Sequence, residues 1–125
     1  MYRFTVALLL VIASTAASSA QGHLPSIWQG EHGAVLKILT GDPATGAFSG
    51  VFVSNPAGPC AAVPYNATGR IRGNWIGFRT WKTWSPDCNV TAVWSGRLVG
   101  PATIVAHWTA IGVVRTRGTE VFHLL

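Results

Sequence analysis

Turn-forming residues recur about every ten positions after residue 20, and this regular punctuation limits what the chain can fold into. The plainest turns are Thr40-Gly41-Asp42-Pro43, Arg72-Gly73-Asn74, Ser85-Pro86-Asp87 and Gly100-Pro101. The segments between turns are rich in β-branched and aromatic residues and have no helical period. This pattern predicts a meander of short strands that forms a barrel or a sandwich.

Eight strands are expected along the chain. They lie near residues 26–39, 47–54, 67–71, 75–82, 90–99, 103–109, 112–116 and 118–124. Alternation gives several of them one face of aromatic and small residues, as with Ala92, Trp94 and Gly96. If eight strands close into a barrel, its interior is either filled by side chains or wide enough for one small ligand.

The first twenty residues have the three parts of a secretory signal peptide. A basic start, Met1-Tyr2-Arg3, precedes an apolar stretch from Phe4 to Ala13 and small residues that end with Ser18-Ser19-Ala20. The apolar stretch is shorter than the roughly 20 residues that span a bilayer. We therefore expect residues 1–20 to be a leader and residues 21–125 to be one domain, secreted or periplasmic, with no membrane anchor.

Two cysteines, Cys60 and Cys88, follow the predicted leader. In an oxidising compartment such a pair is expected to form a disulfide, in preference to free thiols or a metal site. The chain-entropy model assigns the closure of a loop of this length roughly 3 to 4 kcal/mol of stability.

Charge and histidine spacing exclude several classes of function. The net charge is +5, but the lysines and arginines are spread singly or in loose pairs, so no nucleic-acid partner is expected. The histidines at positions 23, 32, 107 and 123 have no HxH or HxxxH spacing, and the chain has no phosphate-binding glycine loop and no nucleophile elbow. We expect neither an enzyme nor a metal site, although a Ser/His/acid set assembled by the fold is the alternative.

Six tryptophans are the unusual feature of the composition. Trp28, Trp94 and Trp108 lie on expected inward faces beside glycine and alanine. Large residues next to small ones can be simple packing complementarity, or they can wall a small-molecule cavity. The sequence leaves both interpretations open.

Several short motifs occur in a recognisable order. They are Trp28 with Gly33 five residues on, Phe48-Ser49-Gly50-Val51-Phe52, Thr68-Gly69-Arg70, Gly77-Phe78, Val93-Trp94-Ser95-Gly96, Trp108, and Gly118 with Glu120 and Phe122. In this order and at these spacings the chain resembles the avidin–streptavidin family of biotin-binding proteins over nearly all of residues 21–125. The resemblance implies an all-β, eight-stranded, antiparallel up-and-down β-barrel with biotin as its ligand and no cofactor.

The cysteine neighbourhoods are similar to those of the dimeric rhizavidin branch. Gly58-Pro59-Cys60 before Pro64-Tyr65, and Asp87-Cys88-Asn89 before Val93, carry this likeness. In that branch a disulfide ties the loop over the pocket mouth to the loop between the fifth and sixth strands. That branch also lacks the tryptophan that tetrameric members lend to a neighbour, and no tryptophan follows Trp108 here. The resemblance therefore implies a homodimer.

The family's pocket encloses the bicyclic ring of biotin in aromatic walls, with donors for the ureido oxygen and acceptors for the ureido N–H groups. By resemblance, Trp28 forms the floor of the pocket, and Trp94 and Trp108 form its walls. Ser54 matches an acceptor for one ureido N–H, and Asn55 begins the loop that closes over the ligand.

The polar part of that pocket is eroded in this chain. The three donors to the ureido oxygen align with Gly30, Ala34 and Phe52, and none of these side chains carries a donor. The positions that meet the sulfur and the tail align with Val90 and Ala92. Losing three hydrogen bonds at one oxygen is expected to weaken biotin binding by several orders of magnitude.

Two new polar groups stand at the expected pocket. Glu120 matches the family's acidic or amide acceptor but is one methylene longer than the usual aspartate, and His32 shares the inward parity of Trp28. One hypothesis is that His32 and Glu120 pair inside the cavity and recognise another ligand, or biotin in a weaker mode. The alternative is that His32 fills space or turns toward solvent.

A further wall tryptophan has two candidates in a segment that is slightly shorter than in relatives. Trp81 matches the family's Trp-Lys pair but lies off the parity of Phe78, which a bulge would reconcile. Trp84 has the parity of Phe78 but lies nearer the turn. We expect Trp81 to line the pocket.

The expected function is therefore that of a secreted protein that holds biotin or a biotin-like molecule inside the barrel, with lower affinity than its relatives. The alternative is an avidin-fold protein that has lost biotin and recognises another ligand or acts as an interaction module.

Overall fold

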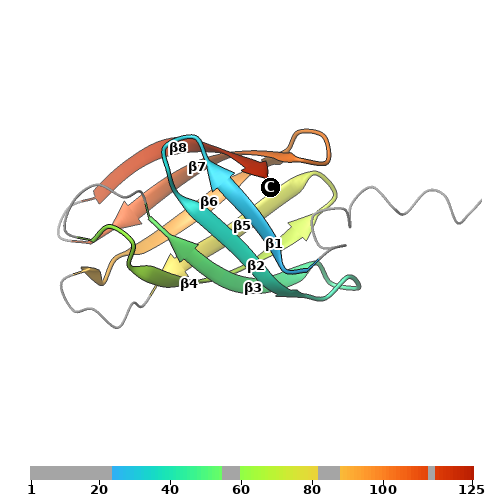
Figure 1. Cartoon of the computed structure of the whole chain (residues 1–125), viewed down its shortest axis with the longest axis horizontal. Helices are drawn as coiled ribbons and strands as arrows, with labels where there is room; N and C mark the ends of the chain where they lie inside the picture. Colours follow the sequence, from blue (N-terminus) through green and yellow to red (C-terminus); the bar gives the residue numbers. More distant parts are fainter. Residues whose placement is uncertain (1–23, 55–59, 82–87, 113–114) are drawn as a thin grey trace, which may run out of the picture.

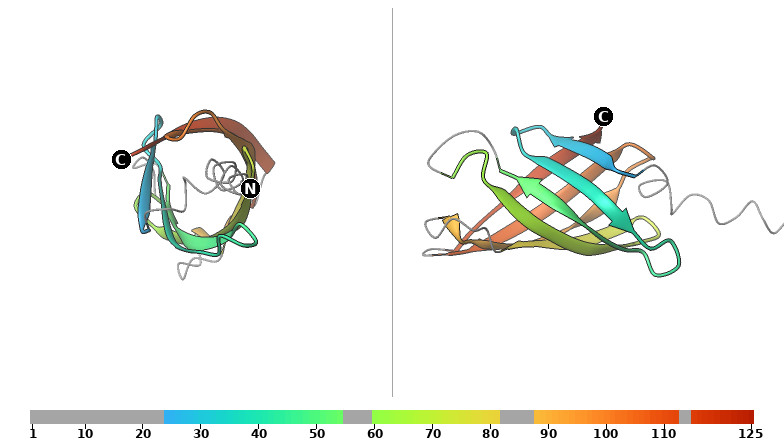
Figure 2. Two further views of the ribbon diagram at one scale, coloured as in Figure 1. Left: turned by 90° about the vertical axis from the view of Figure 1, so that its right-hand side faces the viewer. Right: turned by 60° about the horizontal axis from the view of Figure 1, so that its bottom comes forward.

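The computed structural model describes residues 24–54, 60–81, 88–112 and 115–125. Eight antiparallel strands follow one another around a closed barrel (Figure 1). The strands are β1 (Ser26–Gly30), β2 (Val35–Gly41), β3 (Ala47–Val53), β4 (Pro64–Arg72), β5 (Trp75–Trp81), β6 (Thr91–Leu98), β7 (Thr103–Ile111) and β8 (Arg115–Leu124). Seen end-on, the strands form a ring, so the barrel is confirmed and the sandwich is excluded (Figure 2).

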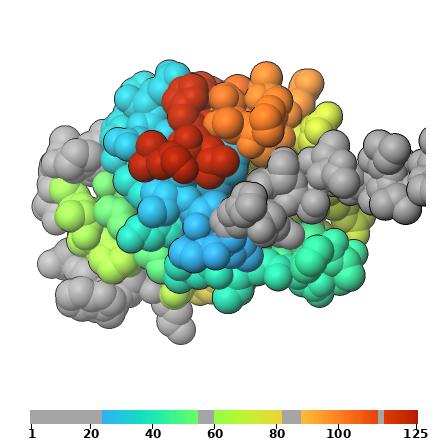
Figure 3. All heavy atoms as spheres, turned by 45° about the vertical axis from the view of Figure 1, so that its right-hand side comes forward, coloured from blue at the N-terminus to red at the C-terminus, as the bar shows by residue number. Residues whose placement is uncertain are grey.

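The barrel closes where the last strand pairs with the first. Trp28 stands opposite Leu124, and Gly30 opposite Phe122. On the surface, the C-terminal strand lies directly against the N-terminal one (Figure 3). A closed ring leaves no strand edge free to pair with another chain.

The expected total of eight strands is correct, although two of the expected strand boundaries are wrong. The strand expected over 26–39 is in fact the β1–β2 hairpin, because a tight turn interrupts it at Gly33, which has φ 94°. The strands expected over 112–116 and 118–124 are one strand, β8, in which Gly118 pairs with Trp108. Strands β3, β5, β6 and β7 lie within two residues of their expected bounds, whereas β4 begins three residues earlier than expected, at Pro64.

The apolar core fills one end of the barrel. The side chains of Ile76 and Ile104, near the starts of β5 and β7, and of Ile38, in the middle of β2, are fully buried, and Phe122 joins them from β8. Trp28 is also fully buried, and its indole N–H donates a hydrogen bond of 3.1 Å to the Ser26 hydroxyl. The other end of the barrel is lined by aromatic, small and polar residues together.

Some predictions fall on parts of the chain that the structure does not describe. The expected leader (residues 1–20), Asn55 and Trp84 lie outside the described ranges. Within those ranges, no helix has the length and apolar character needed to cross a bilayer.

Candidate ligand-binding cavity

A cavity of about 540 Å³ opens at the end of the barrel that includes the β1–β2 turn, the end of β3 and the start of β4. This volume lies within the range of small-molecule sites. Its walls come from strands far apart in the sequence, since Ala34 precedes β2, Thr80 lies on β5 and Ala110 on β7. The barrel interior is thus divided between an apolar core at one end and a cavity at the other.

Trp94 is the centre of an aromatic cluster at the base of the cavity. Its ring stacks on Phe78 at 5.2 Å and 6°, and Phe52, Phe122 and Trp108 are tilted against it at 5.1, 5.7 and 6.1 Å. Such stacked and tilted arrangements are the favourable geometries of aromatic pairs. Because Trp94, Phe52 and Trp108 also line the cavity, they present a rigid apolar surface to a ligand.

Tryptophans lie next to small residues in this barrel, and this arrangement both packs the core and shapes the cavity. A Cβ atom at Gly118 would lie 2.7 Å from Cζ2 of Trp108, so this glycine lets the indole lie flat across β8. Trp108 and Trp94 line the cavity, as expected for wall residues. Trp28 is instead part of the core, and the structure does not place it among the residues that line the cavity.

Two hydroxyl groups at the cavity wall are held by the segments that the disulfide joins. Cys60 and Cys88 are bonded, with their Cα atoms 5.5 Å apart. The Ser54 hydroxyl donates to the Cys60 carbonyl at 3.1 Å, and the Tyr65 hydroxyl donates to the Cys88 carbonyl at 2.6 Å. Burial raises the pKa of Tyr65 above its ordinary value. Since both hydroxyl protons are engaged, the free lone pairs can accept hydrogen bonds from a ligand.

The wall position on β5 belongs to Thr80, which the sequence analysis did not single out. Its hydroxyl oxygen accepts a hydrogen bond of 3.3 Å from the Trp94 indole. The ladder is regular here, with Thr80 opposite Ala92 and Trp81 opposite Asn66, so the bulge that would turn Trp81 inward is absent. The structure does not place Trp81 in the cavity: Arg79, on the exposed side of β5, lies 4.7 Å from its ring centre.

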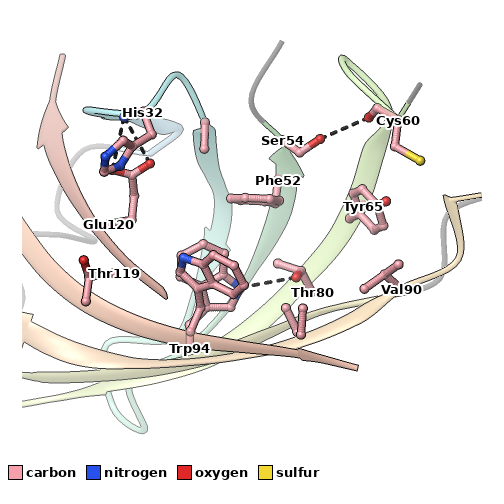
Figure 4. A pocket seen from close by; sticks show the side chains of 14 residues that line it. His32, Phe52, Ser54, Cys60, Tyr65, Thr80, Val90, Trp94, Thr119 and Glu120 are labelled. Carbon is pink, nitrogen blue, oxygen red and sulfur yellow. Dashed lines mark hydrogen bonds and ion pairs between the residues drawn. The ribbon is translucent and has the colours of Figure 1, made fainter. Parts of the chain in front are cut away.

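Glu120 and His32 pair at the mouth of the cavity (Figure 4). The contact agrees with the expected pairing, and the exposed His32 ring agrees with the alternative that it turns toward solvent. Glu120 Oε1 lies 3.0 Å from His32 Nδ1 and accepts from the Val121 amide at 3.0 Å. The His32 amide contacts both carboxylate oxygens at 3.2 Å. The Glu120 side chain is only 4% exposed, whereas that of His32 is 70% exposed. The carboxylate therefore fastens the β1–β2 turn to β8 from inside.

The positions aligned with the family's missing donors have distinct environments. Ala34 and Phe52 line the cavity, as do Val90 and Ala92, and all four are apolar. Gly30 is not a lining residue, because a Cβ atom there would lie 2.6 Å from Glu120 Oε2. The Glu120 carboxylate thus occupies the space that a side chain at position 30 would fill.

Several lining residues were missed from the sequence, namely Tyr65, Thr80, Ala110 and Thr119. Ala110 lies two residues after Trp108 on β7, so the alternation rule could have identified it. Thr119 neighbours Glu120 on the opposite parity, and no simple pattern predicts it. Among the described residues, no group of three His, Cys, Asp or Glu side chains could hold a metal ion.

Comparisons with known proteins agree with this fold. The chain is 32% identical over 88 residues to afifavidin from Afifella pfennigii, an alignment covering 66% of the chain and 54% of that protein. The chain thus spans about half the length of this curated relative. No family model matches the sequence.

Several solved structures are similar to this fold over most of the chain. Apo shwanavidin has a TM-score of 0.72 at 26% identity, covering 82% of this chain and 96% of that one. A complex of short afifavidin with biotin has a TM-score of 0.70 at 28% identity, covering 87% and 98%. Rhizavidin has a TM-score of 0.67 at 27% identity, covering 80% and 81%. By its closed barrel, its ordered motifs and these relatives, the chain is similar to proteins of the avidin–streptavidin family.

Proposed function

We propose that this protein is an exported binding protein that holds biotin or a biotin-like molecule in the barrel cavity, with no catalytic step. The observation that carries the proposal is an open cavity of about 540 Å³ walled by Trp94, Trp108 and Phe52. The short afifavidin complex shows a relative with the same fold binding biotin.

The polar groups of the cavity suit the N–H groups of a cyclic urea. Ser54 and Tyr65 have engaged protons and free lone pairs, and the Glu120 carboxylate accepts hydrogen bonds. All three are fixed by contacts within the protein before any ligand arrives. Fixed groups lose little conformational entropy on binding, so each contact contributes more of its energy to affinity.

We infer that biotin binds less tightly than in a site with a complete set of donors. At the aligned donor positions, Ala34 and Phe52 offer no hydrogen-bonding side-chain group, and Gly30 is covered by Glu120. A buried carbonyl oxygen without a partner costs about 1 to 3 kcal/mol. The aromatic walls still contribute to binding, so affinity is reduced and not abolished.

Titration of the purified protein with biotin tests this function, with tryptophan fluorescence and binding heat as readouts. Saturable quenching accompanied by heat is expected below about 1 mM biotin. The Ala110→Trp variant fills the cavity and should abolish both signals, whereas Ala102→Trp, at an exposed turn, should retain them. Absence of quenching and heat in the unmodified protein would refute biotin binding.

We further propose that the protein acts outside the cytoplasm as a homodimer. The leader-like residues 1–20 and the Cys60–Cys88 disulfide support an oxidising destination. Exposed apolar residues on the outer face of β6 and β7, among them Val93 and Ile111, support association with a second copy.

A further inference from the structure

Arginines that are separated in the sequence lie together on the outer face of β4, β5 and β6. They are Arg70 and Arg72 on β4, Arg79 on β5 and Arg97 on β6, and all four are exposed. Arg72 stands directly opposite Trp75 on β5, and Arg97 stands opposite Trp75 from the other side. Because neighbouring strands lie about 4.8 Å apart, the register of the sheet gathers these charges on one small area. We call this area the arginine face.

The charges of the arginine face have no carboxylate partner in the part of the chain that the structure describes. The ion pairs found there join Glu120 to His32 and Glu31 to His123, and neither includes an arginine. Like charges that share one face repel one another, and a bound anion relieves that repulsion. Guanidinium groups also match the geometry of carboxylate and sulfate-like oxyanions with paired N–H donors. The arginine face is therefore complementary in charge to a polyanion.

Trp75 adds a flat aromatic surface between the arginines. A Cβ atom at Gly77 would lie 2.4 Å from Cη2 of Trp75, so the indole lies across this glycine. Trp75 nevertheless remains 46% exposed, which leaves the outer side of its ring to solvent. An exposed indole of this kind can stack on a ring of a ligand while the neighbouring guanidinium groups bind the ligand's anionic groups.

An open groove of about 780 Å³ follows the arginine face along the outside of the barrel. Arg70, Arg72 and Arg79 line it together with Trp75, and none of these four residues lines the interior cavity. Its charges are spread over neighbouring strands and are not focused on one point. This layout suits an extended chain better than a compact small molecule.

The aromatic residues of the face favour a polysaccharide over a single-stranded nucleic acid. Proteins that bind single strands stack successive bases on successive aromatic side chains. Here Trp81, further along β5, is already in contact with a cation, because the Arg79 guanidinium lies 4.7 Å from its ring centre. The indole of Trp75 is thus left to stack, which suits one sugar ring in a chain that is held mainly by its charges.

We propose that the arginine face binds an acidic polysaccharide, whose carboxylate or sulfate groups contact the arginines and one of whose sugar rings stacks on Trp75. Trp75 begins β5, whereas Thr80, near the other end of that strand, lines the interior cavity. The polysaccharide therefore lies toward the closed end of the barrel and leaves the cavity mouth open. The site anchors the protein to an anionic matrix and is independent of the ligand inside the barrel.

Calorimetric titration with heparin, a sulfated uronic-acid polysaccharide, tests this proposal at about 0.15 M salt, where distant surface charges are screened. Arg70→Gln/Arg72→Gln should weaken heparin binding about tenfold or more, because charge-assisted contacts are lost. The matched control Arg115→Gln/Arg117→Gln removes the same charge from the exposed start of β8 and should weaken binding less than about threefold. Trp75→Ala changes no charge and should weaken binding about threefold or more, because stacking is lost.

The possible outcomes are distinct. Equal losses in the two double variants would overturn the proposal, since net charge alone would then explain binding. So would no binding of heparin by the unmodified protein, or an undiminished affinity in Trp75→Ala. Tighter binding of poly(dT) or of phosphatidylserine vesicles than of heparin would assign the face to a nucleic acid or a membrane instead, and this comparison needs no variant to fold. Biotin titrations report separately on the cavity, so failure of biotin to bind would overturn the proposed function and leave this inference in place.

Discussion

At the scale of single residues, Ala34 and Phe52 control how a carbonyl-bearing ligand can bind. Both line the cavity, and neither side chain offers a hydrogen bond. Ala34→Ser combined with Phe52→Tyr would add two hydroxyl donors with little change in volume. Each new bond contributes about 0.5 to 1.5 kcal/mol, so biotin affinity should rise about tenfold to a hundredfold.

Calorimetric titration of the double variant and of each single variant checks this prediction. The single variants should each give part of the gain. As a control for general effects of an added hydroxyl, Phe48→Tyr changes a buried ring that does not line the cavity, and it should not tighten binding. Unchanged biotin affinity in the double variant would show that the ligand's carbonyl does not lie beside these positions.

Tyr65 makes a separate prediction about alkaline pH. Burial raises the pKa of its hydroxyl above the ordinary 10.0. The folded pKa exceeds the unfolded one, so the associated stability is complete below about pH 10 and is lost as pH rises through the folded value. The free energy of unfolding should therefore decline above pH 10 less steeply in Tyr65→Phe than in the unmodified protein.

Absorbance at the tyrosinate band measures this pKa directly. The chain has two tyrosines, Tyr2 and Tyr65, so subtracting the Tyr65→Phe titration from that of the unmodified protein isolates Tyr65. A midpoint above 10 is expected, and a midpoint at or below 10 would contradict the burial argument. Tyr65→Phe should also lower the free energy of unfolding by about 1 kcal/mol, because the bond to the Cys88 carbonyl is lost.

At the scale of strands, alternation and motif matching disagree on β5, and alternation gives the residue that lines the cavity. Parity correctly assigned Ala92 and Trp94 to one side of β6. On β5, the same rule continued from Phe78 gives Thr80, which lines the cavity, whereas the motif match favoured Trp81. Matching a family's residue types fails where a chain has changed them, but the pleat of a strand follows from backbone geometry.

Some features of the cavity could not be predicted from the alternation of side chains along a strand. The parity that grouped His32 with Trp28 does not extend through the β1–β2 turn, and His32 is mostly exposed. Gly118 was expected to begin a new strand, yet it lies within β8, where the absence of a side chain leaves space for Trp108. The bonds of Ser54 and Tyr65 to cysteine carbonyls depend on closure of the whole barrel, so local sequence patterns do not reveal them.

The disulfide links two elements of the cavity wall, and its removal should affect both stability and binding. Closing the loop between Cys60 and Cys88, a separation of 28 residues, is worth about 3 to 4 kcal/mol. Urea denaturation of Cys60→Ser/Cys88→Ser should show a loss of that size. Ligand affinity should fall as well, because the carbonyls that orient Ser54 and Tyr65 belong to these cysteines.

Chemical reduction of the unmodified protein is the matched control for the double variant. It should reproduce the loss of stability without altering any side chain other than the cysteines. A double variant as stable as the oxidised protein would show that the bond adds no net stability. Unchanged affinity in a folded double variant would show that strand pairing alone holds the two hydroxyl groups in place.

At the scale of the whole molecule, a closed barrel can associate only through its side-chain faces. Strand β8 pairs with β1, so the described strands leave no edge open for another chain. The outer face of β6 and β7 carries three exposed apolar residues, Val93, Val105 and Ile111, at 54%, 37% and 49% exposure. Val93 and Ile111 are diagonal neighbours on this face, whereas Val105 stands opposite Arg97. Exposed apolar neighbours can mark an interaction surface.

We therefore predict a dimer built on the outer face of β6 and β7. Light scattering coupled to size exclusion should give twice the monomer mass for the unmodified protein. Val93→Glu combined with Val105→Glu should give the monomer, because it places like charges in an apolar interface. Leu39→Glu, at an exposed apolar position on β2, should remain dimeric. A monomeric unmodified protein at about 100 μM would rule out a dimer with a Kd in the micromolar range or tighter, and a dimeric double variant would move the interface elsewhere.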